Sequence, residues 1–451
     1  MLIGNYIFID ISFIRMRNFL LIFGLVFLIL SGFTAIAQEP LSLSASIENA
    51  LKNNYSIQIS RNDSQIAVNN NSPGNAGMLP TVDVTAGITK AIVNTNQEYS
   101  NGNIVNQSGA NSDGINAGAR LNWVLFDGLK MFAAKSRLNA EADYYGVQLK
   151  IEIENTVAGV MENYFRAVSL LQDIRVLDSA IAIFDERVRI AELRFEVGSG
   201  SKLDLLQSQT DRNARKSLRL QQLLSYNNAL ASLNRLMGKN DFVSWRLTDS
   251  IVVSYKPTLD DLKKTVPLNN FELQAVKKQE ETFKYRVDEV RALRYPLLNL
   301  NVDYNYSRTE NEVGFALLNQ NQGLYSGLTL SWNLFSGWNT NRQIKNAKLS
   351  LSSASLLLSD TRLKIDQQLY VAFYQYEAEQ EILELETQNA AVATENIKIA
   401  LESFRLGSIS GLQLKDAQNS YEAAMSRLVS SKLQAKLSEI TLMRLNGELV
   451  K

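Results

Sequence analysis

The chain has 451 residues, and its 46 Lys and Arg residues balance its 46 Asp and Glu residues, which argues against a nucleic-acid partner. It contains no cysteine and no histidine, so disulfides, thiolate metal sites, most metalloenzyme schemes and Ser-His-Asp triads are excluded. This composition speaks against an enzyme, and we expect neither a cofactor nor a metal centre.

Residues 1–37 have the pattern of a signal peptide. Two arginines precede an apolar run over residues 19–30, and an Ala-Ile-Ala sequence before Gln38 supplies a cleavage signal. A membrane anchor is the alternative, but the apolar run is short and ends in small residues. We therefore expect an exported protein whose mature chain starts near Gln38.

The mature chain opens with a helix over residues 45–70, followed by a β-hairpin over residues 80–127. In the first strand, apolar residues such as Val82 and Val84 alternate with polar residues such as Asp83. Residues 94–114 are rich in Asn, Ser and Gly, and this composition predicts a polar loop between the strands. The hairpin has one apolar and one polar face.

A second hairpin, over residues 296–336, repeats this alternation around a polar loop at residues 308–324. In a barrel, the polar faces of both hairpins would line the lumen. The side chains on these faces are Asp83, Arg120, Asn299, Asn301 and Asp303. A transmembrane β-barrel and a soluble sheet with one wet face both give such alternation. A barrel needs about eight strands or more, so four strands per chain predict oligomerisation, and a trimer with twelve strands leaves an aqueous lumen.

A long helix without proline follows each hairpin. Over residues 129–195 it would be about 100 Å long. Its apolar residues recur in steps of four and three that alternate with a single lapse between Leu171 and Leu177, the pattern of a coiled-coil seam. The seam residues are Ile153, Val157, Val160, Tyr164, Ala167, Leu171, Ile174, Leu177, Ile181, Phe184, Val188, Ala191 and Phe195. We expect helical rods of similar length beside it, with the carboxylates of the rods on polar faces.

Return helices over residues 203–237 and 412–446 complete two helical hairpins, at residues 129–237 and 338–446. Each return helix is about half as long as its rod, so another helix must stack on its end. We expect residues 270–293 to serve the first return helix and the N-terminal helix to serve the second. Residues 239–267 would form a small belt around the middle of the rods.

The two halves also share sequence anchors. Trp123 and Trp332 are 209 residues apart, and the same offset relates Gly198 to Gly407. One constant offset over several anchors predicts an internal duplication. The first repeat would be residues 38–258 and the second residues 259–451, each with a helix, a β-hairpin and a long helical hairpin.

These features resemble the TolC-like outer-membrane efflux protein family. The resemblance covers essentially the whole mature chain, and its most specific motifs are Arg194-Phe-Glu-Val-Gly-Ser-Gly-Ser-Lys-Leu-Asp204 and Phe404-Arg-Leu-Gly-Ser-Ile-Ser-Gly-Leu-Gln413. It implies a membrane β-barrel joined to an all-α coiled-coil tunnel, closed as a homotrimer. The protein would lie in the outer membrane of a Gram-negative bacterium, in contact with outer-membrane lipid, and extend into the periplasm.

The resemblance also implies roles for individual residues. The tip turns would dock on a periplasmic adaptor (membrane fusion) protein through Val197, Gly198, Ser199, Leu406, Gly407 and Ser408. Asp204, Gln413 and Asp416 occupy the positions of the periplasmic entrance, where the family carries a second acid in place of Gln413. Alternatives are glycines that only turn the chain and an Asp416 that is merely solvated.

Trp123, Phe126, Trp332 and Phe335 would form an aromatic girdle at the membrane interface, or simply pack where strand meets helix. The implied function is the exit duct of a tripartite efflux or type I secretion system, through which an adaptor and an inner-membrane transporter pass substrates without chemistry. The alternative is a periplasmic structural or adhesive coiled-coil protein with a soluble β head.

Overall fold

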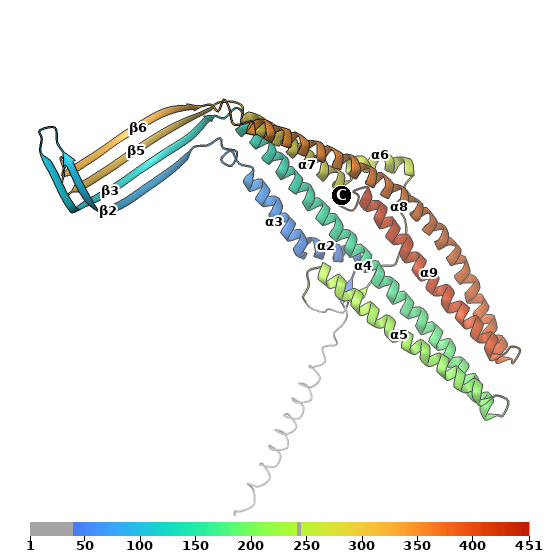
Figure 1. Ribbon diagram of the computed structural model, residues 1–451. Coiled ribbons are helices and arrows are strands. Elements are labelled where there is room, and N and C mark those ends of the chain that lie inside the picture. Colours follow the sequence, from blue (N-terminus) through green and yellow to red (C-terminus); the bar gives the residue numbers. More distant parts are fainter. Residues whose placement is uncertain (1–38, 241–244, 451) are drawn as a thin grey trace, which may run out of the picture.

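The computed structural model describes residues 39–240 and 245–450, and it joins a β-sheet to a long helical body at a bend (Figure 1). The expected signal peptide, residues 1–37, lies outside the described residues. Within the described ranges, no helix has the length and apolar character needed to cross a membrane.

The sheet contains two antiparallel hairpins. Strands β2 (Thr81–Glu98) and β3 (Ile104–Phe126) form the first, and β5 (Leu297–Asn311) and β6 (Leu318–Ser331) form the second. β3 also pairs with β5, so the order is β2-β3-β5-β6 and the outer edges belong to β2 and β6. Apolar side chains such as Val84 and Leu328 are exposed, because no part of the described chain covers that face.

The expected polar loops are wrong in extent. The strands run through most of residues 94–114 and 308–324, and the pairing of β2 with β3 continues to Glu98 and Ile104, inside the expected loop. A polar strand is stable here because the backbone ladder needs no particular side chain. The Asn and Ser residues of these segments therefore belong mostly to polar strands and not to turns.

The helical body contains two pairs of helices with matching lengths. α4 (Lys130–Glu196) and α8 (Asn339–Arg405) have 67 residues each, and α5 (Lys202–Leu236) and α9 (Gly411–Leu445) have 35 each. α4 buries most of the expected seam, including Val160 and Tyr164. Phe195, at the end of the seam, is instead exposed.

The stacking of the short helices is the reverse of the expectation. The N-terminal segment forms two helices, α2 (Leu43–Asn53) and α3 (Tyr55–Asn70), and the Asn54 side chain between them donates to the carbonyl of Leu236 at the end of α5 (2.9 Å). α7 (Phe271–Ala292) follows α6 (Leu259–Asn269), and Asn270 donates to Leu445 at the end of α9 (3.0 Å). Each return helix thus takes the helix from its own half of the sequence.

The short helices stack on the ends of the return helices, so that four helices lie side by side along the whole length of α4 and α8. In the upper body α3, α4, α7 and α8 lie side by side, and in the lower body α5, α4, α9 and α8 do (Figure 1). The expectation that rod carboxylates lie on polar faces is wrong for Glu154, Glu289 and Glu439, which are buried. Neighbouring helices cover more of each rod than a two-stranded seam would.

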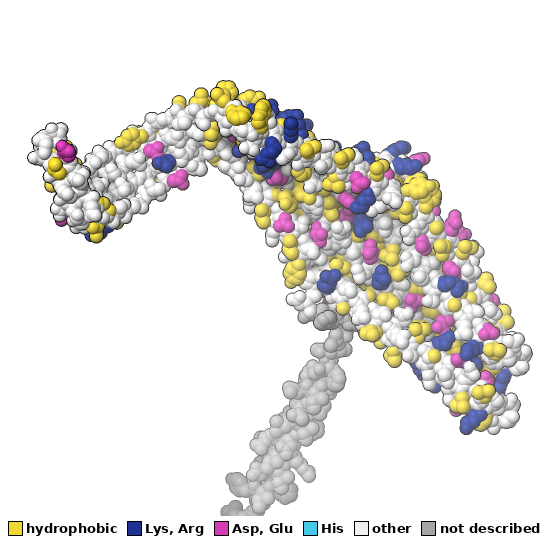
Figure 2. Space-filling view, viewed as in Figure 1, with side chains coloured by type: hydrophobic (Ala, Val, Ile, Leu, Met, Phe, Trp, Pro, Cys, Tyr) yellow, Lys and Arg dark blue, Asp and Glu magenta, His cyan; other side chains and the backbone are white. Residues whose placement is uncertain are grey.

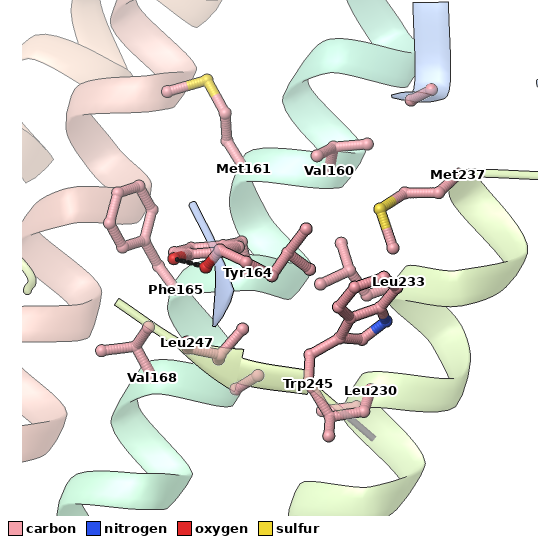
Figure 3. Packing of buried hydrophobic residues seen from close by; sticks show 14 of the residues in the cluster. Val160, Met161, Tyr164, Phe165, Val168, Leu230, Leu233, Met237, Trp245 and Leu247 are labelled. Carbon is pink, nitrogen blue, oxygen red and sulfur yellow. Dashed lines mark hydrogen bonds between the residues drawn. The ribbon is translucent and has the colours of Figure 1, made fainter. Parts of the chain in front are cut away.

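The main core lies at mid-rod, where a short strand crosses the helices. β1 (Glu39–Leu41) pairs in parallel with β4 (Trp245–Leu247), and Figure 3 shows Trp245 and Leu247 packed against α4 and α5. The Tyr164 hydroxyl donates to the carbonyl of Leu41 at 2.8 Å. This contact ties the N-terminal strand to the middle of α4.

Candidate functional site

The first tip turn joins α4 to α5 through Val197, Gly198 and Ser199. Gly198 has φ of +75°, a left-handed conformation that glycine adopts without steric cost. Its N–H donates to the carbonyl of Phe195 (3.1 Å), and the N–H of Ser199 donates to that of Arg194 (2.9 Å), which ends the helix. The Val197 side chain is 75 % exposed at the end of the body.

The second tip turn has the same geometry. Gly407 has φ of +76°, and its N–H donates to the carbonyl of Phe404 (3.1 Å). The N–H of Ser408 donates to the carbonyl of Ser403 (2.9 Å), and Leu406 is as exposed as its counterpart in the first turn. Each tip therefore presents one exposed aliphatic side chain on a rigid, internally hydrogen-bonded turn.

Arginine side chains connect the two tips. Arg194 Nη2 donates to the carbonyl of Phe404 (2.5 Å), and its guanidinium lies 4.5 Å from the centre of the Phe404 ring. Glu186 accepts from Arg189 (2.7 Å) and from Arg405 at the end of α8 (2.9 Å). These hydrogen bonds, mainly that of Arg189, lower the pKa of Glu186 to about 2.

The three expected entrance residues do not form one cluster. Asp204, in the first turn of α5, lies 3.7 Å from the buried guanidinium of Arg187. Gln413 completes the capping box of α9, in which Ser410 is the N-cap and the Gln413 side chain accepts from the N–H of Ser410 (2.9 Å). Asp416 is exposed one turn later and forms no ion pair with the described residues. Of these three residues, Asp416 is the one acidic side chain that forms no ion pair within the described part of the chain.

A buried polar cluster behind the tips was missed by the sequence pattern. Arg187 on α4 is 2 % exposed and lies 3.2 Å from Asp211 on α5. Lys415 on α9 contacts the other oxygen of Asp211 at 2.9 Å. Gln418, also on α9, lies within 3.5 Å of the Ile183 carbonyl. These contacts hold the two helical hairpins of one chain together.

The four expected girdle residues lie at the bend between sheet and helices: Trp123, Phe126, Trp332 and Phe335. The indole N–H of Trp123 donates to the carbonyl of Met78 (3.0 Å), and that of Trp332 donates to the carbonyl of Arg294 (3.0 Å). Both indoles thus fix the segment that enters their hairpin. All four rings remain exposed, and the two of the second half are the more exposed.

The polar face of the sheet carries a charged row across three strands. Arg120 is paired in register with Asp83 on one side and with Asp303 on the other. Its Nε lies 2.5 Å from an oxygen of Asp303. Asn299 and Asn301 continue the same polar face of β5. These five residues therefore share one face, as the alternation predicts.

The described ranges offer no obvious site for chemistry. Within residues 39–240 and 245–450, no group of three or more Asp and Glu side chains could hold a metal ion. The half-buried Asp211 is paired with both Arg187 and Lys415. The exposed apolar side chains of the tips and the aromatic rings at the bend are suited to binding a partner. The polar face of the sheet is suited to contact with water.

Comparison with known proteins gives one family. The family model described as "Outer membrane efflux protein" matches residues 46–239 and 264–448. The outer membrane efflux protein BepC of Brucella suis biovar 1 is 21 % identical over 428 residues, which cover 93 % of this chain and 89 % of that protein.

Solved structures share the fold at low identity. The outer membrane protein VceC of Vibrio cholerae superimposes with a TM-score of 0.76 at 16 % identity, over 90 % of this chain and 96 % of that one. The CmeC outer membrane channel of Campylobacter jejuni gives 0.77 at 16 % identity, over 90 % and 85 %. The open MtrE outer membrane channel of Neisseria gonorrhoeae gives 0.73 at 15 % identity, over 91 % and 89 %.

Proposed function

The chain belongs to the outer membrane efflux protein family, and we propose that three copies of it form the exit duct of a tripartite efflux or type I secretion system. It is a TolC-like transport protein of the Gram-negative outer membrane and not an enzyme. Substrates would enter from a periplasmic adaptor and an inner-membrane transporter. The observation that carries the proposal is the exposed sheet with two unpaired edges.

An isolated four-stranded sheet is not stable in hydrocarbon. The outward-facing backbone N–H and C=O groups of β2 and β6 have no partner strand within the described chain. Each such unsatisfied group in lipid costs about 4 kcal/mol. Pairing β6 of one copy with β2 of the next satisfies both edges. Three copies give twelve strands with the face of Arg120 and Asp303 toward a wet lumen.

The helices would continue the lumen as a periplasmic tunnel. Two repeats, residues 38–258 and 259–451, supply one hairpin and one helical rod pair each. Equal lengths of 67 residues for α4 and α8, and of 35 for α5 and α9, support this duplication. The charges between α4, α5 and α9 would hold each protomer together while neighbouring protomers pack against α8 and α5.

We assign the two tip turns to the adaptor. Val197 and Leu406 are exposed aliphatic side chains on rigid turns, and Gly198, Ser199, Gly407 and Ser408 keep the surrounding surface small and flat. An adaptor could bury both side chains without unfolding the turns. The geometry supports docking at the end of the tunnel.

The charge at the periplasmic entrance would come mainly from Asp416. Three copies of Asp416 around a narrow mouth form an anionic ring that attracts cations. Asp204 contributes less charge to the mouth because it lies near Arg187, and Gln413 serves as a helix cap. The four aromatic residues at the bend would mark the periplasmic boundary of the membrane.

The test is the state of the detergent-purified mature protein. We expect a trimer by native mass spectrometry, heat-modifiable migration in gels and conductance in planar bilayers. A monomer, or a protein that stays soluble without detergent and gives no conductance, would instead indicate a periplasmic protein with a soluble β head.

A further inference from the structure

A pocket of about 310 Å³ lies at the second bend, between the end of β6 and the start of α8. Three aromatic side chains and one arginine line it, and hydroxyl and amide groups complete it; no acidic side chain is among the described residues around it. We call this surface the basic-aromatic bend: Arg294, Trp332, Leu334, Phe335, Ser336, Trp338 and Asn341.

Trp338 is the most unusual residue of this surface. It has φ of +64°, in a region that bulky side chains rarely adopt, and its side chain is 70 % exposed. Leu129 has the same conformation at the first bend, so the turn sets the backbone and the indole is what the second bend adds. Its one ring contact is with Phe335, edge-on at 6.1 Å, which leaves both rings open to a partner outside the chain.

The charge around the pocket is positive. The guanidinium of Arg294 donates to the amide oxygen of Asn341 (2.9 Å). Neither Arg294 nor Arg342, Lys345 and Lys348 on α8 forms an ion pair with the described residues. Figure 2 shows Lys and Arg side chains together at the bend, beside hydrophobic side chains. The surface therefore combines uncompensated cations with exposed aromatic rings.

The first bend serves as an internal comparison. The segment entering each hairpin is fixed by an indole N–H, and the residue that accepts it is Met78 in the first half and Arg294 in the second. At the start of the following helix, the first half has Asp127, which accepts from the N–H of Met131 (2.9 Å), and the second half has Ser336. The second bend thus has an arginine where the first has a methionine, and a serine where the first has a carboxylate.

We propose that the basic-aromatic bend binds the headgroup phosphate of an anionic phospholipid from the inner leaflet of the outer membrane. Arg294 and Arg342 would hold the phosphate, because guanidinium matches phosphate in charge and geometry. Trp332, Leu334 and Trp338 would pack against the glycerol and the first acyl carbons. A bent aromatic belt with nearby cations is the expected chemistry of a membrane interface.

This inference rests on the proposed embedding of the sheet. The apolar side chains of Leu328 and Leu330 on β6 and of Leu334 beyond it are exposed in one series that ends at the pocket. If that series faces acyl chains, the pocket lies at headgroup depth on the periplasmic side. A neighbouring copy of the chain is the other conceivable occupant, and the experiment separates the two.

The experiment measures tryptophan quenching in the full mature protein reconstituted into vesicles. One set of vesicles contains brominated phosphatidylglycerol and the other brominated phosphatidylcholine at the same bromine content. Trp245 is buried at mid-rod and gives a constant background. We expect stronger quenching by phosphatidylglycerol, and we expect this excess to fall as NaCl is raised, because salt screens exposed charges.

Substitutions then show which residues cause the excess quenching by phosphatidylglycerol. Trp332→Phe combined with Trp338→Phe should remove most of the excess quenching. Arg294→Gln should reduce the preference for phosphatidylglycerol about fivefold, the effect of one cation near an anionic surface. The matched control is Trp123→Phe at the first bend, which should keep the excess. Circular dichroism and trimer mass confirm that each variant is assembled.

Each other outcome has a defined meaning. Equal quenching by both lipids, or an excess that survives Arg294→Gln, overturns the lipid site and leaves the duct intact. Quenching of Trp123 without any quenching of Trp338 assigns the pocket to a neighbouring copy and also overturns the site. No quenching by either lipid would contradict the membrane embedding itself.

Discussion

Glu154 on α4 is a carboxyl group in a poor environment for its charge. Its side chain is 6 % exposed, and its Oε1 has no hydrogen-bond partner among the described residues. Burial raises the pKa of Glu154 to about 7, against a weaker opposing effect of Arg444. The folded state therefore holds a proton that the unfolded chain releases near pH 4.5.

Because the pKa of Glu154 is raised on folding, stability should fall as pH rises from about 4.5 to about 7 and stay reduced above it. We expect Glu154→Gln to raise the free energy of unfolding by about 1–3 kcal/mol at pH 8 and by little at pH 4.5. Chemical denaturation of detergent-purified protein at several pH values measures this. Glu192→Gln, at an exposed position of α4, is the control, and parallel pH profiles for Glu154→Gln and wild type would contradict the prediction.

The tip glycines allow a test of docking. Gly198 and Gly407 have positive φ with nearly open space around them, so valine would strain the turn and add bulk to the docking surface without a clash in the core. We expect Gly198→Val or Gly407→Val to abolish export while trimers still assemble. Drug or secretion assays in cells, with trimer quantity on gels, measure both effects.

The control is Gly146→Val within α4, where a Cβ also meets nothing but φ is ordinary. This variant should export normally. Normal export by both tip variants would mean that the glycines only turn the chain and that the adaptor binds elsewhere.

Tip and core residues differed in how well the sequence predicted them. Gly198 was predictable because a glycine after a long helix has a specific backbone role. Arg187 was not, because the heptad pattern leaves it off the seam between Phe184 and Val188. Both α5 and α9 pack on α4, and Arg187 pairs with Asp211, which Lys415 of α9 also contacts. No local pattern encodes these contacts between helices.

At the scale of elements, the sequence predicted helices well and helix partners poorly. The alternation of four and three located the seam at Val160 and Tyr164 because those side chains face a neighbour along the whole rod. It could not decide which short helix stacks on which return helix. That choice depends on Asn54 and Asn270, whose amides reach carbonyls in another helix.

Asn54 has two functions that can be separated. Its carbonyl oxygen caps α3 by accepting from the N–H groups of Ser56 and Ile57, and its NH2 group donates to Leu236 at the end of α5. We expect Asn54→Ala to lower the free energy of unfolding by about 2–4 kcal/mol, because a cap and a buried bond are both lost. Asn54→Asp should keep the cap but still destabilise, since it cannot donate to the carbonyl.

Thermal unfolding followed by circular dichroism measures these effects. Ser42→Ala is the matched control, because Ser42 caps α2 through one N–H, that of Ala45 (3.2 Å), and its loss should cost about 1 kcal/mol. If Asn54→Asp were as stable as wild type, the bond to α5 would contribute nothing and the stacking would rest on packing alone.

At the scale of the whole molecule, the sheet and the helical body expose different kinds of surface. The sheet exposes an apolar face and two strand edges. The lower body instead exposes charged side chains of both signs, as the face drawn in Figure 2 shows. Strand number was predictable from two hairpins. The need for further copies stays a prediction, which rests on the argument that four strands cannot close a wet barrel. The lengths of β2 and β3 were not predictable, because their polar residues resemble a loop.

Three-fold assembly would turn a single exposed carboxylate into a property of the channel. Each copy adds one Asp416, and three charges at a narrow mouth interact with a passing ion together. We expect Asp416→Asn to lower the cation-to-anion permeability ratio about twofold in planar bilayers at low salt, with less effect at high salt because of screening. Asp366→Asn, an exposed position far up α8, is the control. An unchanged ratio in Asp416→Asn would mean that the side chain is solvated away from the path, and that the charged row of Arg120 and Asp303 sets selectivity instead.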